Sequence, residues 1–588
     1  MNKNVLKNLF STEKLPETIF WIAAIVLLFL NLGKADLAGS ESRWAGVVRE
    51  MFSSGNFLQP TVNFEPYFDK PLGSYWMIAF FTLFNHNTVN ELLIRIPSAI
   101  AGLATLWATR SIAGIYGDKR IVIAAGWLML TIYSFAFWGR LGEADMLNAA
   151  FSTIAVAWYL RQRENAGFGS YLLFGALCAI GGQTKGLSAI AVPVLAVFVD
   201  VILRKDWKKH LNWQLVAAGI LSAMIYFVPF ICAMYKSGDY SSNGLALVFR
   251  ENIVRYFQAF DHEEGWYAYF IHVAQLFLPW TPFLIFALIW TVKEWQKEDL
   301  NVRWLLLSIG AIFLIFSLSD SKRIYYILPI LPYCAVATAR YLCTENLSGI
   351  QRKIRDILFK IYGNIMLPAS ILLLIAGVAA IFTVQLFTQN IEMQSEIRNI
   401  AQITILPSLM ILVLALQYRK NTNHYWYAGV NREFGLATLS FLIIMITVFC
   451  VIRPYADAHF RTEKQYFAEI AELFRKENVK TNQIYFFYKR FRAAIFYFNR
   501  PEKIEVIVID PTQKKMLEEP LVKFLQNRST TEKSYLISQD RYFNRIQDPF
   551  IRKELATGRT VDEPEFSWEN RETKREKFRM IILPPRKP

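Results

Sequence analysis

The sequence predicts an α-helical polytopic membrane protein with about 13 transmembrane helices and a small soluble α/β domain at its C-terminus. Of the 588 residues, 54% are hydrophobic and only 19% are charged, whereas a soluble chain of this length divides into several domains and carries more charge. Apolar runs recur as far as residue 453 and then stop. Because a bilayer-spanning helix needs roughly 20 apolar residues, these runs predict membrane spans that are followed by a soluble tail.

Fourteen apolar segments precede the tail, and we expect all but one of them to span the membrane. They are residues 18–36, 73–86, 96–116, 119–138, 146–160, 170–183, 186–203, 212–235, 268–292, 302–319, 323–342, 361–385, 401–418 and 434–453. Segment 73–86 is short for a span, so we place it in the outer interface. The N-terminus, with Lys3, Lys7 and Lys14, and every later basic loop then lie on the cytoplasmic side, as the positive-inside rule requires. An odd number of spans places the tail outside.

Two domains are expected from this pattern. Residues 1–457 form a transmembrane domain with outer loops at 37–95 and 236–267, and residues 458–588 form a small soluble α/β domain. Helix spacing in the tail relates Phe467, Ile470, Ala471 and Phe474. Short buried strands are expected at Ile484–Tyr488, Ile504–Ile509 and Tyr535–Ser538, and another at Met580–Leu583. The tail contains no catalytic motif, which favours a structural or docking role.

The charge pattern argues against one class of partner. The net charge is +16 and the isoelectric point is about 9.4. Lys and Arg are spread over many short loops and form no single stripe, so nucleic acid is not an expected partner. The positive-inside bias of cytoplasmic loops explains most of the excess, and a share could serve an anionic lipid substrate. The five cysteines lie in or beside apolar segments without a CxxC pair, which is typical of small buried residues.

Polar motifs fall at the ends of spans on the predicted outer side. They are Ser40–Arg43, Tyr67–Pro71, Glu143–Asp145, Lys185 and Ser319–Arg323. These motifs are far apart in sequence, but the topology collects them on one face of the membrane. A charge at a helix end can reach water without crossing the apolar core. A face that gathers carboxylates and cations in this way is a candidate active site.

The carboxylates of this face have two interpretations each. Glu41, just outside the first span, is well placed to act as a base; alternatively, Glu41 and Glu50 only solvate a short amphipathic helix that lies on the membrane. Glu143 and Asp145 carry a desolvation cost so close to the bilayer, which favours a general base or a metal ligand. The alternative is a structural ion pair between Arg140 and Asp145.

The cations of this face suit a phosphate group. Lys70 lies in an extended loop, Lys185 lies in a glycine-rich break, and Lys322 and Arg323 are followed by Tyr326. Lysine binds phosphate as a point charge, and bare backbone N–H groups beside glycine can join it. The alternatives are a snorkelling side chain for Lys70 and plain loops for the others.

These motifs follow one another in an order that resembles a known family. The ordered set is Ser40–Trp44, Tyr67–Trp76, Arg95–Ser98, Arg140–Met146, Thr184–Gly186, Leu278–Trp280 and Ser321–Pro329. It resembles the polyprenyl-phosphate-sugar glycosyltransferases of GT-C fold, and among them the lipid A 4-amino-4-deoxy-L-arabinose transferases and the protein O-mannosyltransferase superfamily. The resemblance covers the whole membrane region, and the tail occupies the place of the family's periplasmic domain.

The resemblance implies an integral membrane, inverting glycosyltransferase. Its donor would be a sugar on undecaprenyl (polyprenyl) phosphate, and its acceptor lipid A or another surface glycolipid or glycan. The protein would lie in the bacterial inner membrane, with a cytoplasmic N-terminus and a periplasmic C-terminal domain. An enzyme of the O-mannosyltransferase type, acting on Ser/Thr, is one alternative; a secondary transporter or lipid flippase is another, and a binding protein without activity a third. Transporters hold charges near the midplane and show inverted repeats, whereas here the charges crowd one edge.

The resemblance also implies roles for individual residues. The family's Asp-Glu pair after the first span corresponds to Ser40 and Glu41, and Asp145 corresponds to the second acidic site, so these three are the candidate catalytic residues. Arg43, Tyr67 and Lys70 correspond to residues around the donor phosphate. The sequence adds Lys185, Lys322, Arg323 and Tyr326 to that phosphate-binding set.

Two further positions concern a metal. Asp69 and His262 correspond to positions that can bind a zinc ion in the family, with Asp69 in place of the more usual Glu. A divalent cation, Zn²⁺ or Mg²⁺, is therefore a candidate cofactor. One carboxylate and one imidazole are fewer ligands than a zinc site needs.

Overall fold

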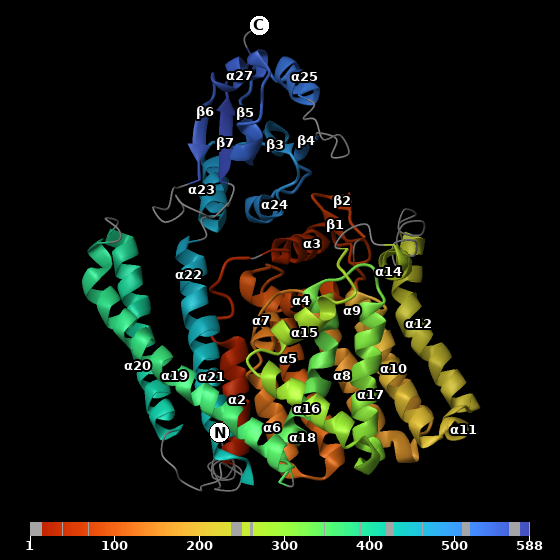
Figure 1. Cartoon of the computed structure of the whole chain (residues 1–588). Helices are drawn as coiled ribbons and strands as arrows, with labels where there is room; N and C mark the ends of the chain where they lie inside the picture. The colour runs from red at the N-terminus through yellow and green to blue at the C-terminus, as the bar shows by residue number, and fades with distance from the viewer. Residues whose placement is uncertain are drawn as a thin grey trace, which may run out of the picture. The chain divides into compact units, whose positions relative to one another are not determined.

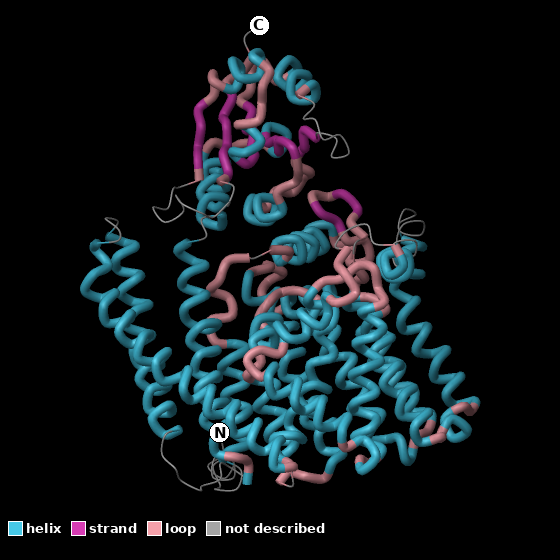
Figure 2. The backbone as a smooth tube through the Cα atoms, viewed as in Figure 1, coloured by secondary structure: helices cyan, strands magenta, loops and turns pink. Residues whose placement is uncertain are grey.

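The computed structural model describes residues 15–37, 39–68, 70–236, 250–258, 263–345, 347–386, 391–418, 429–460, 463–508, 518–563 and 577–586. The chain forms two compact units, which can be followed in Figures 1 and 2. Unit 1 comprises residues 1–33, 68–84 and 92–455, and unit 2 comprises residues 34–67, 85–91 and 456–588.

Unit 1 is a bundle of helices. Its helices include α2 (Leu15–Phe29), α4 (Gly73–Leu83), α5 (Glu91–Ala113), α6 (Lys119–Leu130), α7 (Tyr133–Gly139), α8 (Asp145–Gln162), α9 (Phe168–Lys185), α10 (Ser188–Arg204), α11 (Trp207–His210), α12 (Trp213–Lys236), α14 (Arg255–Phe257), α15 (Ala268–Leu276), α16 (Thr281–Lys293), α17 (Leu300–Ser317), η5 (Ile324–Ile330), α18 (Leu331–Cys343), α19 (Gly349–Thr383), α20 (Ile391–Tyr418) and α21 (Arg432–Ile446). Helix α22 (Arg453–Phe460) begins in unit 1 and ends in unit 2. Large side chains such as Trp280, Trp304 and Tyr333 fill its core.

All of the predicted apolar segments fall on helices, but the predicted count of about 13 spans is not confirmed. Among the described residues, seven helices are long and apolar enough to cross a bilayer, or nine if each bent pair is one span. The bent pairs are α6 with α7, at 63°, and α15 with α16, at 117°. Segment 73–86 becomes α4, whose 11 residues extend about 16 Å, roughly half of a hydrocarbon core.

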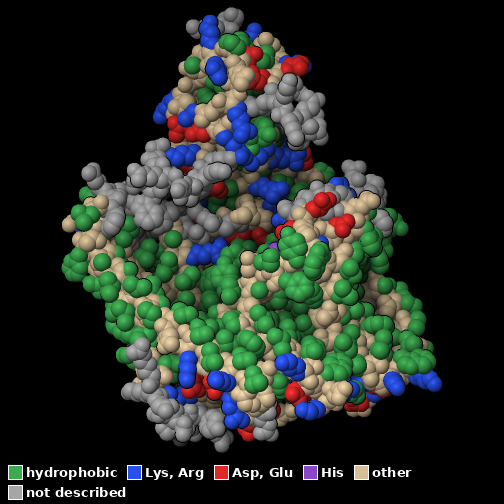
Figure 3. All heavy atoms as spheres, viewed as in Figure 1, with side chains coloured by type: hydrophobic (Ala, Val, Ile, Leu, Met, Phe, Trp, Pro, Cys, Tyr) green, Lys and Arg blue, Asp and Glu red, His purple; other side chains and the backbone are tan. Residues whose placement is uncertain are grey.

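Apolar side chains cover the flank of the bundle, as Figure 3 shows, and charged side chains gather at its end. Along α12 and α19, large side chains point outward, among them Val216, Ile220, Ile365 and Leu372. A helix pairs nearly all of its backbone groups internally, as hydrocarbon requires. The exposed apolar faces are therefore the expected lipid-facing surfaces.

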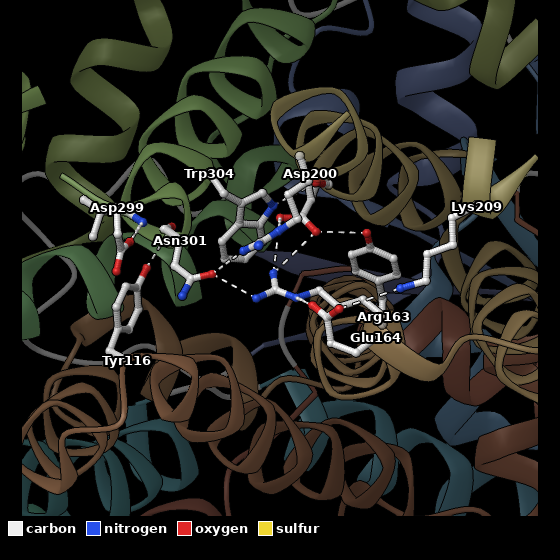
Figure 4. Close-up of polar contacts among 12 residues, drawn as sticks. Tyr116, Arg163, Glu164, Asp200, Lys209, Asp299, Asn301 and Trp304 are labelled. Carbon is white, nitrogen blue, oxygen red and sulfur yellow. Dashed lines mark hydrogen bonds and ion pairs between the residues drawn. The ribbon is translucent and has the colours of Figure 1, made fainter. Parts of the chain in front are cut away.

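One end of the bundle is closed by a buried polar network, which Figure 4 shows. The Asp200 carboxylate is fully buried and accepts hydrogen bonds from the Tyr159 hydroxyl (2.9 Å), Arg163 (3.2 Å) and Arg204 (2.9 Å). Both guanidinium groups also donate to the Asn301 side-chain oxygen, at 2.9 and 2.5 Å. The network joins the ends of α8 and α10 to the start of α17. It lies where the sequence predicts cytoplasmic basic loops.

Unit 2 is an α/β domain around a five-stranded sheet. The strand order is β4 (Glu505–Val508), β3 (Ile484–Tyr488), β5 (Ser534–Gln539), β7 (Phe578–Leu583), β6 (Arg559–Asp562). β3 is parallel to both β4 and β5, whereas β7 is antiparallel to β5 and β6. The helices include α23 (Glu463–Lys476), α24 (Arg492–Phe498), α25 (Glu519–Asn527), α26 (Asp540–Phe543) and α27 (Pro549–Leu555). Phe467, Ile470 and Phe474 are buried along one face of α23, as their spacing predicts.

The N-terminal part of unit 2 departs from the expected domain division, in which residues 37–95 form a loop of the transmembrane domain. Residues 34–67 form α3 (Glu41–Ser54) and the hairpin β1 (Thr61–Val62) and β2 (Glu65–Pro66), and they group with residues 456–588. Arg49 on α3 donates to the backbone oxygens of Ile495 and Phe496 at 2.6 and 2.9 Å. Asn63 exchanges two hydrogen bonds with the Ile504 backbone. These long-range bonds are invisible in the sequence pattern.

The structure of helix α3 contradicts the interpretation that Glu41 and Glu50 only solvate a helix on the membrane surface. Glu41 and Glu50 are fully buried, so they do not solvate an amphipathic surface helix. The Glu50 carboxylate accepts from the backbone N–H groups of Asn63 (2.8 Å) and Phe64 (2.9 Å) and from the Thr61 hydroxyl (2.6 Å). It therefore holds the β1–β2 turn. Burial lowers the pKa of Arg49, and the neighbouring Glu50 carboxylate opposes that shift.

Candidate active site

An ion pair between Asp145 and Lys185 is the centre of the candidate site in unit 1. Asp145 is the first residue of α8, and Lys185 is the last residue of α9. An acid at a helix N-terminus and a lysine at a helix C-terminus each have the sign that the helix dipole favours. The Lys185 ammonium donates to the Asp145 carboxylate, and the two side chains are only 10% and 6% exposed. A buried charge pair of this kind needs precise positioning.

Two tyrosines of η5 complete the surroundings of Lys185. The Lys185 ammonium lies 5.0 Å from the ring centroids of both Tyr325 and Tyr326, a distance that gives a cation–π attraction. The Arg323 guanidinium lies 5.7 Å from the Tyr325 ring. The structure thus brings together three predicted site residues, Asp145, Lys185 and Tyr326, and sets Arg323 beside them. It adds Tyr325, which the sequence signals only as the neighbour of Tyr326.

The end of α9 is held by close packing against α4. The Ser74 hydroxyl donates to the Thr184 backbone oxygen at 2.7 Å. A Cβ atom at Gly73 would lie 2.7 Å from the Gln183 backbone oxygen, so only glycine permits this approach. Gly186 follows with a φ of +117°, which favours glycine and ends the helix. Lys70 is half-buried and lies three residues before Gly73, so it directly precedes the segment of α4 that packs against α9.

Lys322 has a different environment from the one its sequence predicts. The residue is 4% exposed, and its ammonium donates to the backbone oxygens of Ser319 (2.5 Å) and Glu264 (3.1 Å). Two of its three N–H groups are therefore used inside the protein. We assign it to positioning of the 319–323 loop. The Glu264 carboxylate in turn contacts His272 Nε2 at 3.1 Å, a pair for which the sequence gives no local signal.

Arg140 does not pair with Asp145, contrary to one interpretation of the sequence. Its guanidinium donates to the backbone oxygens of Leu27 (2.7 Å) and Leu30 (2.8 Å), at the end of α2, where backbone oxygens lack partners within the helix. Asp145 has Lys185 as its cation instead. The Glu143 backbone oxygen accepts from the Ser98 hydroxyl at 3.0 Å, which fixes the turn before α8.

Four of the predicted residues, Ser40, Glu41, Arg43 and Tyr67, lie in unit 2. Ser40 is the N-cap residue of α3, and its side chain makes no capping hydrogen bond. Glu41 follows as the first residue of that helix. The Arg43 guanidinium donates to the Tyr67 hydroxyl at 2.8 Å and lies 5.6 Å from the Trp44 ring centroid. Arg43 and Tyr67 thus form one polar pair.

The predicted metal positions, Asp69 and His262, lie outside the described residues. Within the described part of the chain, no group of three or more His, Cys, Asp or Glu residues is arranged to hold a metal ion. Binding of Zn²⁺ or Mg²⁺ therefore stays a prediction.

Comparisons with known proteins find a family model and several curated relatives that are similar to parts of this chain. The family described as dolichyl-phosphate-mannose-protein mannosyltransferase matches residues 69–232. An undecaprenyl phosphate-α-4-amino-4-deoxy-L-arabinose arabinosyl transferase of Enterobacter sp. (strain 638) is 26% identical over 68% of this chain and 70% of its own. A protein of that type from Pseudomonas fluorescens (strain Pf0-1) is 28% identical over 50% of this chain. An uncharacterized protein of Aquifex aeolicus (strain VF5) is 28% identical over 56% of this chain.

The sequence matches are partial, whereas the fold match extends over nearly the whole chain. The matched segments span 64% of the Aquifex protein and 51% of the Pseudomonas protein. The crystal structure of ArnT from Cupriavidus metallidurans bound to undecaprenyl phosphate has a TM-score of 0.66 and 18% sequence identity; the match covers 96% of this chain and 97% of that one. The chain is therefore a multi-pass membrane protein with the GT-C fold, and it is related in sequence to these transferases.

Proposed function

From this relation to GT-C fold transferases, we propose that the protein moves a sugar from a polyprenyl phosphate, of undecaprenyl type, to an acceptor at the outer face of a bacterial inner membrane. The observation that carries the proposal is the buried Asp145–Lys185 pair beside Tyr325 and Tyr326. A carboxylate and an ammonium side by side at the end of an apolar bundle suit a reaction that needs both a base and a phosphate-binding cation.

The chemistry assigns a role to each partner. The bond between the anomeric carbon and the phosphate oxygen breaks, and the leaving phosphate gains negative charge. A preorganised cation stabilises that charge most strongly where water is excluded. Lys185 is that cation in our proposal, with Lys70 and Arg323 as further phosphate contacts and Tyr326 as a hydrogen-bond donor. The acceptor oxygen attacks the opposite face of the sugar, which gives inversion.

Asp145 is the proposed base. The Lys185 ammonium holds its carboxylate, and an arriving donor phosphate would compete for the same ammonium. Donor binding would thus free one carboxylate oxygen to accept the proton of the acceptor hydroxyl. Glu41 is the second candidate base, and Ser40, which lacks a carboxylate, would orient a substrate hydroxyl.

The proposed acceptor is lipid A or another surface glycolipid or glycan. An O-mannosyltransferase-like reaction on Ser/Thr is the second candidate, which the match of residues 69–232 to the mannosyltransferase family favours. The acceptors differ chemically: a lipid A phosphate is already anionic, whereas a Ser/Thr hydroxyl must lose its proton to a base such as Asp145.

Turnover of purified full-length protein tests the reaction. We expect transfer from an undecaprenyl-phosphate-linked sugar to lipid A, detected as a mass increase of the acceptor, with a Ser/Thr peptide as the comparison acceptor. With an acceptor that attacks through a hydroxyl group, Asp145→Asn should lower turnover about 100-fold or more, the scale of general base catalysis. Lys70→Ala should lower it about tenfold, and Lys297→Gln, at a site 81% exposed, should have no effect. Unchanged turnover in Asp145→Asn would sink the site assignment, and sugar movement across vesicles without transfer would favour a flippase.

Accessibility to an impermeant thiol reagent tests the orientation. Single cysteines would be introduced at Ser54, exposed near the end of α3, and at Lys297, in a loop predicted to be cytoplasmic. A Cys232→Ser background removes the one native cysteine that is exposed among the described residues. We expect intact spheroplasts to label position 54 only, because the positive-inside rule places the basic loop inside. Labelling of position 297 alone would invert the topology.

A further inference from the structure

The sheet of unit 2 has the topology of a ligand site at the carboxyl ends of its strands β3 and β5. We call these strand ends the sheet edge. β3 connects through α24 to β4 on one side, and the chain then crosses to β5 on the other side of β3. The strand order therefore reverses between β3 and β5. In open α/β sheets, ligands bind outside the carboxyl ends of the strands at such a reversal.

A strained residue stands at this point. Tyr488, the last residue of β3, has a φ of +83°, a conformation that bulky side chains rarely adopt. Strain of this kind clusters at ligand sites, where the surrounding structure maintains it. The Tyr488 ring stacks on the Tyr542 ring of α26, with centroids 3.8 Å apart and planes at 20°. The stack therefore bridges the chain segments that follow β3 and β5.

Two cations converge on the same stack. The Lys489 ammonium lies 5.7 Å from the Tyr542 ring centroid, and the Arg541 guanidinium lies 4.5 Å from it. Arg541 also donates to the Tyr542 hydroxyl at 2.6 Å. Lys489 is exposed and Arg541 half-buried. Cation–π attraction offsets part of the repulsion between these like charges, and an anion bound between them would offset more.

Three described carboxylates near this end of the sheet contact β7. Asp540 and Asp562 both contact the Arg579 guanidinium of β7, at 3.1 and 2.6 Å. Glu563 accepts from the Phe578 backbone N–H at 3.0 Å. These three carboxylates thus contact β7, whereas Lys489 and Arg541 lie at the Tyr488–Tyr542 stack.

We propose that this edge binds a phosphorylated saccharide, with Lys489 and Arg541 holding the phosphate and the half-buried Tyr488 ring contacting the sugar. Cations give charge complementarity to a phosphate, and an aromatic ring offers an apolar face to the sugar's C–H groups. The assignment as the dock for a glycolipid acceptor's head group rests on the proposed function. It gives the soluble unit a substrate-selecting role that is separate from the Asp145–Lys185 chemistry.

Binding to full-length protein in detergent tests the proposal. The probe is N-acetylglucosamine 1-phosphate, with N-acetylglucosamine and inorganic phosphate as comparison ligands, measured by ligand-observed saturation-transfer NMR. We expect the sugar phosphate to bind at least tenfold more tightly than either comparison ligand. Lys489→Gln and Arg541→Gln should each weaken it about tenfold, the factor for losing one charge-assisted hydrogen bond. Raising the salt from about 0.05 to 0.5 M should weaken it further.

Lys480→Gln is the matched control. Lys480 lies just before β3, at the amino end of the sheet, and pairs with Glu532 with its side chain 70% exposed. Like Lys489→Gln, the Lys480→Gln substitution removes one positive charge from unit 2, and it should leave binding unchanged. Equal weakening in Lys480→Gln would indicate nonspecific attraction. Full binding in Lys489→Gln, or equal binding of phosphate and sugar phosphate, would overturn the proposal.

A second readout separates this inference from the proposed reaction. Lys489→Gln should raise the KM for a phosphorylated glycolipid acceptor about tenfold and leave kcat and the KM for the donor unchanged. Absence of transfer by the unaltered protein, with the probe still bound, would refute the reaction and keep the binding site. Normal transfer with no change in acceptor KM would refute the docking role alone.

Discussion

Replacing Asp145 or Lys185 singly should destabilise the protein, and replacing both together should restore stability without restoring turnover. The variants are Asp145→Asn, Lys185→Met and the double variant. Removing one member of a buried pair leaves the other charge uncompensated, which costs about 3–5 kcal/mol. Neutral partners of similar volume remove that penalty. With a hydroxyl acceptor, turnover should stay about 100-fold or more below the unaltered level in all three variants, because the base is missing, the cation is missing, or both are.

Thermal unfolding in detergent and turnover at a temperature below all transitions measure the two effects separately. Lys297→Gln supplies the control for an exposed pair, because Lys297 and Glu294 form an ion pair whose lysine side chain is 81% exposed. It should not shift Tm measurably. A double variant that loses the sum of the two single losses would show that Asp145 and Lys185 act independently. Turnover recovered in the double variant would show that the pair is structural.

Asp200→Ala should cause a comparable loss of stability without a direct effect on the chemistry. The substitution leaves Arg163 and Arg204 buried without their shared carboxylate, and the Tyr159 hydroxyl without its acceptor. We expect about 3–5 kcal/mol of destabilisation. Asp145 and Arg163 lie at the two ends of α8, whose 18 residues extend about 27 Å. KM for the donor should therefore be unchanged wherever the variant is folded.

Glu164→Gln is the control for this end of the bundle. The Glu164 side chain is 70% exposed, and its contacts with Arg163 and Lys209 are each 3.7 Å. Such surface pairs contribute little, so Tm should hardly change. A Tm drop in Glu164→Gln as large as that in Asp200→Ala would mean that any charge change here is disruptive. An unchanged Tm in Asp200→Ala would show that Asn301 alone holds the two arginines.

The sequence was sufficient to identify each motif of the candidate site, but it did not predict which of these motifs contact one another. Lys185 beside glycines and Glu143–Asp145 at a span boundary were visible as charges near an apolar core. Whether Asp145 would pair with Arg140 or with Lys185 depended on how α8, α9 and α2 pack. Arg140 turned to the end of α2, where unpaired backbone oxygens needed a donor, and Lys185 was left to neutralise Asp145.

By itself, the sequence determined the helical segments of the bundle and the strands β3, β4, β5 and β7, because apolar periodicity over a single segment is a local property. Tertiary structure decided what depends on long-range packing. Strand β6, short and largely exposed, exists only because β7 lies beside it. Glu41 and Glu50 became buried, and Lys322 turned to backbone oxygens, because segments far along the chain surround them. A buried charged side chain pairs with a group that the fold brings close to it, and the residues next to it in the sequence do not determine which group that is.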